Sequence, residues 1–194
     1  MAKLYFRYGA MGSGKTTALL QVAHNYEERH MPVLLIKPEI DTKGDDTVIS
    51  RIGISRQVDL ILPKDKLLLD KGLPLKDLRK PWAIIIDEAQ FLNTQQVDEL
   101  YMVTKKYDIP VLCYGLRCDF QMNGFEGSTR LLQIADDIEE LKTICKCGKK
   151  ATQNLRKVNG EPVFDGQQIA IDNNDKIEYE SICGECYLRL RNKL

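Results

Sequence analysis

The chain has 194 residues, 43% of them hydrophobic and 29% charged, which suits one globular domain with or without a small appendage. Lys plus Arg and Asp plus Glu both total 28, so net charge gives no support to a nucleic-acid or membrane partner. The N-terminal residues lack the features of a signal peptide, and no apolar run approaches the roughly 20 residues of a membrane helix. We therefore expect a cytoplasmic protein.

The first part of the chain alternates apolar segments with an amphipathic one. Residues 3–8 are short, apolar and aromatic, and we expect a strand that runs directly into Gly9. Residues 15–30 contain apolar side chains at helical spacing and are expected to form a helix. Residues 32–36 are apolar on both faces, as strands of parallel sheets are. The polar stretch 38–56 is expected to be a mobile loop.

The same alternation continues to about residue 114. Residues 58–62 predict a short strand and residues 64–71 a weak helix. The most apolar run, 82–86, is expected to be a central strand. Asn93 or Thr94 can cap a helix that ends near Tyr107, and residues 110–114 follow as a strand. This order predicts an α/β fold with a mostly parallel sheet flanked by helices and right-handed crossovers.

The character of the sequence changes near Thr143. Beyond it come cysteine pairs, turn residues and short alternating segments, without a convincing helix. We expect a nucleotide-binding domain at 1–142 and a second domain at 143–194. A domain of about 50 residues buries little core, so it needs a staple such as a bound metal.

Residues 9–16 match the phosphate-binding pattern G-x-x-x-x-G-K-[ST], placed between a predicted strand and a predicted helix. The glycines let backbone N–H groups point at phosphate oxygens, and the following helix adds its positive end. Lys15 is expected to reach the β- and γ-phosphates, and Thr16 to ligate Mg²⁺. The alternative is a glycine-rich turn with a chance lysine. The expected ATP contacts here are Gly9, Ala10, Met11, Gly12, Ser13, Gly14, Lys15 and Thr16.

Two carboxylates, Asp87 and Glu88, follow the central strand. Strand ends of open α/β sheets line the ligand crevice, so Asp87 is expected beside the phosphate loop as a Mg²⁺ ligand. Neighbouring strand residues face opposite sides, so Glu88 is expected to act on something other than the metal. Its target is a water molecule in an ATPase or an alcohol in a kinase. The alternative is a solvated strand end.

Four of the six cysteines form two close pairs, C-x-C and C-x-x-C. Four thiolates suit a closed tetrahedral Zn²⁺ site that holds a small domain together without doing chemistry. A redox pair is the rival interpretation. Cys113 is expected to pack as a small apolar residue, and Cys118 receives no role. The expected zinc ligands are Cys145, Cys147, Cys183 and Cys186.

These features together resemble the thymidine kinases of the bacterial and animal-cytosolic type, from about Ala2 to Tyr187. The segments that carry the resemblance are the phosphate loop, Asp-Glu-Ala-Gln-Phe at 87–91, Gly-Leu-Arg-Cys-Asp-Phe at 115–120 and the cysteine pairs. The resemblance implies transfer of the γ-phosphate of ATP to the 5′-hydroxyl of thymidine. It also implies a homotetramer and feedback inhibition by dTTP.

The resemblance further implies roles for single residues. Glu88 matches the general base that takes the proton of the 5′-hydroxyl, and Arg51 and Gln90 match positions near the ATP phosphates. Residues 115–130 match a flexible lasso that closes over the nucleoside. Simple core packing, or a surface cation in the case of Arg51, is the alternative for several of these positions. The implied nucleoside contacts are Phe91, Leu116, Phe120, Ile169, Ile171, Asp172 and Tyr179.

One departure from the family pattern lies at the expected lip of the nucleoside pocket. Asp172-Asn173 stands where a Gly-Gly pair is usual, so deoxyuridine or another nucleoside remains an alternative acceptor. A different class of function also stays open: a nucleotide-driven motor in which Glu88 polarises water and the zinc module grips nucleic acid. A motor that binds nucleic acid is expected to have a basic surface, and the zero net charge of this chain gives no sign of one. A degenerate pocket is disfavoured because Lys15, Thr16 and both carboxylates are present.

Overall fold

A parallel six-stranded sheet lies at the centre of the computed structural model, which describes residues 1–39, 46–71, 80–168 and 176–192. Its strands stand in the order β5-β2-β6-β7-β1-β8, and each neighbouring pair is parallel. The expected sheet is thus confirmed, and each expected strand is present to within two residues at either end. The strands are β1 (Leu4–Tyr8), β2 (Val33–Pro38), β5 (Leu60–Leu62), β6 (Ala83–Ile86), β7 (Val111–Gly115) and β8 (Asp137–Glu140).

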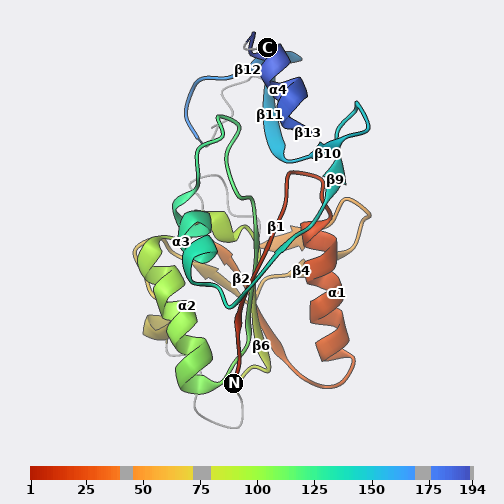
Figure 1. Cartoon of the computed structure of the whole chain (residues 1–194). Coiled ribbons are helices and arrows are strands. Elements are labelled where there is room, and N and C mark those ends of the chain that lie inside the picture. Colours follow the sequence, from red (N-terminus) through yellow and green to blue (C-terminus); the bar gives the residue numbers. More distant parts are fainter. Residues whose placement is uncertain (40–45, 72–79, 169–175, 193–194) are drawn as a thin grey trace.

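Helices cover both faces of the sheet (Figure 1). On one face lies α1 (Lys15–Glu27), and on the other lie α2 (Thr94–Tyr107) and α3 (Glu126–Ile134). The central strand β6 supplies both cores, because side chains alternate along a strand. Ile84 and Ile86 belong to the core under α2, while Ile85 belongs to the core under α1. The capping prediction for α2 is confirmed, since the Asn93 side chain accepts a hydrogen bond from the backbone N–H of Gln96.

Part of the expected mobile loop at 38–56 is ordered as an antiparallel hairpin. Its strands are β3 (Thr47–Ile49) and β4 (Ser55–Gln57), and residues 40–45 lie outside the described part. The hairpin was missed because its strands have only three residues each, too few to show a period. The expected weak helix at 64–71 was also wrong. Only the 3₁₀ turn η1 (Leu69–Lys71) forms, and the Glu99 carboxylate accepts the N–H groups of Leu68 and Leu69 instead.

The expected lasso at 115–130 is shorter than predicted, because Gly115 ends β7 and α3 begins at Glu126. The chain between them, residues 116–125, is the lasso loop. Gly127 suggested flexibility, but it serves close packing: a Cβ there would lie 2.6 Å from the Ala89 carbonyl oxygen. That oxygen belongs to η2 (Ala89–Phe91), the 3₁₀ turn that follows β6.

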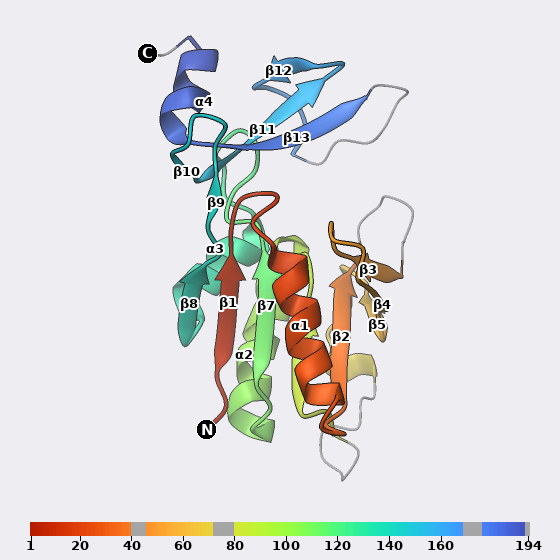
Figure 2. The same cartoon turned by 90° about the vertical axis from the view of Figure 1, so that its right-hand side faces the viewer.

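The C-terminal elements lie beyond the carboxyl ends of the parallel strands (Figure 2). They have a small core of their own that includes two of the paired cysteines. The expectation of no helix here was wrong, since α4 forms directly after Cys183, whose sulfur accepts the N–H of Cys186. These elements are β9 (Thr143–Ile144), β10 (Lys150–Ala151), β11 (Gln153–Val158), β12 (Glu161–Val163), β13 (Ile177–Ile182) and α4 (Gly184–Leu190).

In the part of the chain that the structure describes, no helix has the length and apolar character needed to cross a membrane.

Candidate functional site

The phosphate-binding pattern forms the turn that joins β1 to α1, as the sequence predicted. Gly12 and Gly14 both have positive φ, at 74° and 80°, a region in which residues with a Cβ are strained. No side chain of the described residues caps α1, so the first N–H groups of this helix are left for a ligand. Such a helix end attracts anions, and phosphate above all.

Lys15 folds back over this loop. Its ammonium group donates to the carbonyl oxygens of Gly9 (3.1 Å) and Ala10 (3.0 Å). Burial lowers its pKa, although the carboxylates of Glu88 and Asp87 act in the opposite direction. The Ser13 hydroxyl is buried and finds no hydrogen-bond partner among the described residues. A bound phosphate group would offer the Lys15 ammonium a charged acceptor in place of these two carbonyl oxygens.

The two carboxylates stand at the carboxyl end of β6, next to this loop. Asp87 is buried, and burial together with the neighbouring Glu88 raises its pKa to about 7. Alternation of side chains along a strand was expected to turn Glu88 away from Asp87. This reason was wrong, because β6 ends at Ile86 and Glu88 lies outside the strand. Glu88 instead adopts a left-handed backbone conformation, with φ 51° and ψ 37°.

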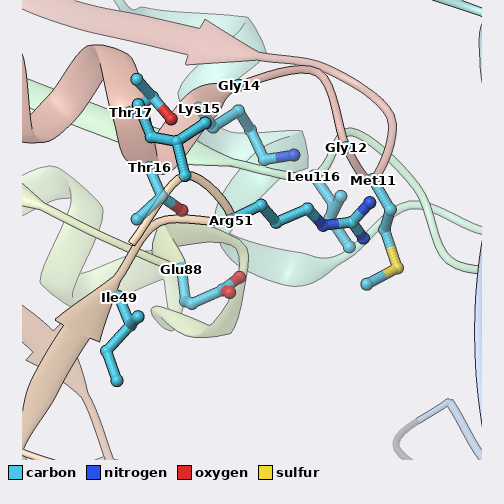
Figure 3. Close-up of a pocket in the computed structure, with 11 residues that line it drawn as sticks. Met11, Gly12, Gly14, Lys15, Thr16, Thr17, Ile49, Arg51, Glu88 and Leu116 are labelled. Atoms are coloured by element: carbon cyan, nitrogen blue, oxygen red, sulfur yellow. The ribbon is translucent and has the colours of Figure 1, made fainter. Parts of the chain in front are cut away.

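The loop and Glu88 open onto a cleft of about 320 Å³. Figure 3 shows the residues that line it. Its lining includes Lys15, Thr16, Glu88 and Leu116. The hairpin β3–β4 brings Arg51 to the same cleft, and one guanidinium nitrogen would lie 3.0 Å from a Cβ on Gly12. Besides two glycines, six of the residues that line this cleft were expected at the site: Met11, Lys15, Thr16, Arg51, Glu88 and Leu116. Thr17, Ile49 and Ile52 also line it and were not expected.

The expected nucleoside contacts fall into separate groups. Phe120 is buried, and Tyr179 lies nearby because both side chains contact one arginine, Arg156. Phe91 packs edge-on against Phe125 instead, with ring centroids 5.5 Å apart. Ile169, Ile171 and Asp172 lie outside the described residues, as does Asn173.

Arg156 was missed by the sequence analysis. Its guanidinium lies 3.6 Å from the centre of the Phe120 ring and donates to the Tyr179 hydroxyl at 3.0 Å. It also donates to the carbonyl oxygens of Gln167 (2.7 Å) and Gln168 (2.8 Å). Arg156 therefore holds the aromatic pair and the chain that leads into residues 169–175.

Asn154 was missed as well, although it ties three segments together. Its side-chain oxygen accepts the N–H of Met11 in the phosphate loop at 2.8 Å, across 143 residues of sequence. Its amide nitrogen donates to the carbonyl oxygen of Cys118 in the lasso loop at 3.1 Å. The small C-terminal sheet is thereby linked to both the phosphate loop and the lasso loop.

We expect Asn154→Ala to lower the free energy of unfolding by about 1–3 kcal/mol, because the buried carbonyl of Cys118 and the partly buried N–H of Met11 lose their partner. Urea denaturation at equilibrium measures this change. Asn25→Ala is the matched control, since Asn25 is exposed on α1 and should change stability little. An Asn154→Ala protein as stable as the wild type would contradict the assigned link.

The four paired cysteines meet at one point, and none of the six cysteines forms a disulfide. Their sulfur atoms all lie within 4.8 Å of one another, and those of Cys147 and Cys183 are 3.6 Å apart. Tetrahedral Zn²⁺ at Zn–S distances of about 2.3 Å needs sulfur atoms about 3.8 Å apart. Backbone hydrogen bonds, foremost from Cys147, lower the pKa of Cys145 to about 7, while hydrogen bonds to the neighbouring thiols, foremost Cys147, raise that of Cys186 to about 12. A metal ion binds thiolates, so its positive charge would be needed to ionise all four. The cluster thus fits a zinc ion in both donor chemistry and spacing.

Cys113 is fully buried in β7, as expected for a small apolar residue, and burial raises the pKa of its thiol. Cys118, to which no role was given, lies buried in the lasso loop.

A phosphate-binding loop at the carboxyl end of a parallel sheet, with an acidic strand end beside it, defines a P-loop nucleotide-binding protein. Comparison with known proteins narrows this class. A model of the thymidine kinase family matches residues 2–187. The chain belongs to the thymidine kinase family and is an ATP-dependent nucleoside kinase.

Curated relatives agree with this family. The thymidine kinase of Streptococcus agalactiae is 45% identical over 190 residues, which cover 96% of this chain and 97% of the relative. That of Streptococcus pyogenes is 45% identical over 189 residues, with the same coverage. That of Streptococcus gordonii is 46% identical over 192 residues, or 97% of each chain.

Proposed function

We propose that this enzyme transfers the γ-phosphate of ATP to the 5′-hydroxyl of thymidine, and of deoxyuridine, to give the monophosphate in nucleotide salvage. The observation that supports this most directly is the shared cleft of Lys15, Thr16 and Glu88. Glu88 lies near the phosphate loop and faces open space that can hold an alcohol. A kinase needs a carboxylate in this place to take the proton of the alcohol that attacks the phosphate. The phosphate loop is proposed to face ATP, with Arg51 at the phosphates and Gln90 beside Glu88 in the same site.

Glu88 is proposed to accept the proton of the 5′-hydroxyl as the oxygen attacks the γ-phosphorus. The transition state of phosphoryl transfer is loose, so the proton leaves late and an ordinary carboxylate suffices. Lys15 offsets the negative charge that the phosphate oxygens carry. Thr16 and Asp87 are proposed to hold the Mg²⁺ that accompanies ATP and neutralises its phosphates.

The nucleoside is proposed to lie between the lasso loop and the C-terminal elements. Leu116, Phe120 and Tyr179 support this placement, because the first lines the cleft and the other two meet at Arg156. Phe91, Ile169, Ile171 and Asp172 complete the proposed set of contacts. Residues 1–142 form the proposed kinase domain, and residues 143–194 the domain that completes the pocket.

Zinc is proposed to bind to the four clustered cysteines, where it would hold the C-terminal elements together without taking part in the reaction. A homotetramer, feedback inhibition by dTTP and a cytoplasmic location are proposed from the family alone.

A transfer assay with γ-labelled ATP and Mg²⁺ tests the proposed reaction. Thymidine, deoxyuridine, deoxycytidine and no acceptor are compared under the same conditions. We expect labelled monophosphate from thymidine and deoxyuridine, and very little from deoxycytidine. Label that appears only as free phosphate, whatever nucleoside is added, would contradict the proposal and point to a nucleic-acid-stimulated ATPase.

A further inference from the structure

The side chain of Gln90 occupies a buried position between Glu88 and the lasso loop. It lies in η2 with 2% of its surface exposed. Its amide nitrogen donates to a Glu88 carboxylate oxygen at 2.6 Å, and its amide oxygen accepts the backbone N–H of Leu116 at 3.0 Å. Both ends of the amide are therefore used inside the protein.

The direction of this amide is fixed by its partners. The Leu116 N–H is a donor and needs the amide oxygen, while the Glu88 carboxylate is an acceptor and needs the amide nitrogen. A flipped amide would lose both hydrogen bonds. Leu116 is the first residue of the lasso loop and also lines the cleft, so one side chain joins the start of the lasso loop to Glu88.

Two glycines make room for this arrangement. A Cβ on Gly115 would lie 2.7 Å from the Gln90 amide oxygen and 3.0 Å from its backbone nitrogen. A Cβ on Gly127 would lie 2.6 Å from the carbonyl oxygen of Ala89 and 2.7 Å from that of Leu92. The turn η2 is thus packed tightly between the end of β7 and the start of α3, which keeps Gln90 in place.

Glu88 needs such support, because nothing in regular structure sets its direction. It lies beyond the end of β6 and has a left-handed backbone conformation, which is costly for a residue with a Cβ. Its side chain opens onto the cleft, where solvent competes for the carboxylate. The hydrogen bond from Gln90 holds one carboxylate oxygen and leaves the other for the cleft.

We propose that Gln90 is a positioning residue, which holds the Glu88 carboxylate at the reacting hydroxyl and is itself aligned by the first N–H of the lasso loop. This inference rests on the proposed role of Glu88 as general base. In this proposal the Gln90 side chain does not contact ATP. It affects the reaction only through the position of the Glu88 carboxylate.

Single-turnover transfer with excess enzyme tests the inference in a double-mutant cycle. Gln90→Met keeps the volume and removes both hydrogen bonds. We expect it to lower the transfer rate by about 10- to 100-fold, as a misplaced reacting group does, with KM for ATP changed less than about twofold. In a Glu88→Gln background, the same Gln90→Met change should have almost no further effect, because Gln90 acts through the carboxylate.

A stability measurement and a control variant keep the test decisive. Equilibrium urea unfolding of Gln90→Met shows whether the variant is folded at the assay temperature, so that a lost rate is assigned to the site and not to unfolding. Gln95→Met is the matched control, since Gln95 is exposed on α2 and should leave the rate unchanged.

The outcomes separate the two ideas. A rate loss by Gln90→Met that persists undiminished in the Glu88→Gln background overturns the positioning role alone. A raised KM for ATP with an unchanged transfer rate does the same and restores the direct ATP contact. Full transfer by Glu88→Gln would instead overturn the general base on which the inference rests.

Discussion

Replacing Glu88 by Gln is expected to lower thymidine phosphorylation by about 10²- to 10⁴-fold, the usual contribution of a general base. Glutamine has the same shape and still offers an oxygen to the amide nitrogen of Gln90, so the geometry of the cleft should survive. What is lost is the capacity to take a proton from the 5′-hydroxyl. The measurement is single-turnover formation of labelled thymidine monophosphate.

Binding and stability should change little in this variant. Equilibrium titration with an ATP analogue should give a dissociation constant within about threefold of the wild type, because Lys15 and the loop N–H groups are untouched. Glu161→Gln is the matched control, since Glu161 is an exposed carboxylate in β12 and its loss should leave the rate unchanged. Transfer at the wild-type rate by the Glu88→Gln enzyme would remove this residue from the mechanism.

The second large effect is expected from Cys183→Ser. The change should reduce bound zinc from about one ion per chain to a small fraction, because a four-thiolate site loses one ligand. Structural zinc contributes about 10–16 kcal/mol in small zinc-binding peptides, which matches or exceeds the whole stability of a typical domain. The C-terminal elements should then unfold at a lower temperature than the sheet.

Transfer activity should fall in parallel, by about 100-fold, since the displacement of a substrate-holding element costs this much. The structural route is Asn154, which holds the phosphate loop, and Arg156, which holds Phe120. Metal analysis, thermal unfolding and the transfer assay are made on the same preparation. Cys113→Ala is the control: it removes a buried thiol in β7 and should keep its zinc. Undiminished transfer by enzyme freed of zinc would separate the metal from the reaction.

The sequence predicted the features that are written in contiguous residues. Five of the six strands of the sheet were expected, because each is a short and mostly apolar run. Strand β8 (Asp137–Glu140) was not expected, since three of its four residues are acidic. The phosphate loop, the capped start of α2 and the cysteine pairs are likewise short patterns with a direct physical reason. The resemblance to a kinase family, carried by these motifs, was confirmed by the comparisons.

Short elements were predicted less well, because their order comes from contacts and not from their own pattern. The hairpin β3–β4 and the seven-residue α4 are too short to be stable alone. The sulfur of Cys183 accepts an N–H in the first turn of α4, so the cysteine cluster and this helix support each other. Helix α3 was expected to be part of a flexible loop, because residues 115–130 match the lasso of the family. In the structure, Gly127 lies in this helix and allows close packing against η2.

The sequence by itself thus determined the fold class, the phosphate loop and the four cysteines that cluster, because each is encoded in short local patterns. The tertiary structure alone decided that Asn154 holds the phosphate loop and that Gln90 joins Glu88 to the lasso loop. These contacts depend on backbone conformation and on groups as far as 143 residues apart. A hydrogen bond across that separation leaves no local pattern, since it exists only once the chain has folded.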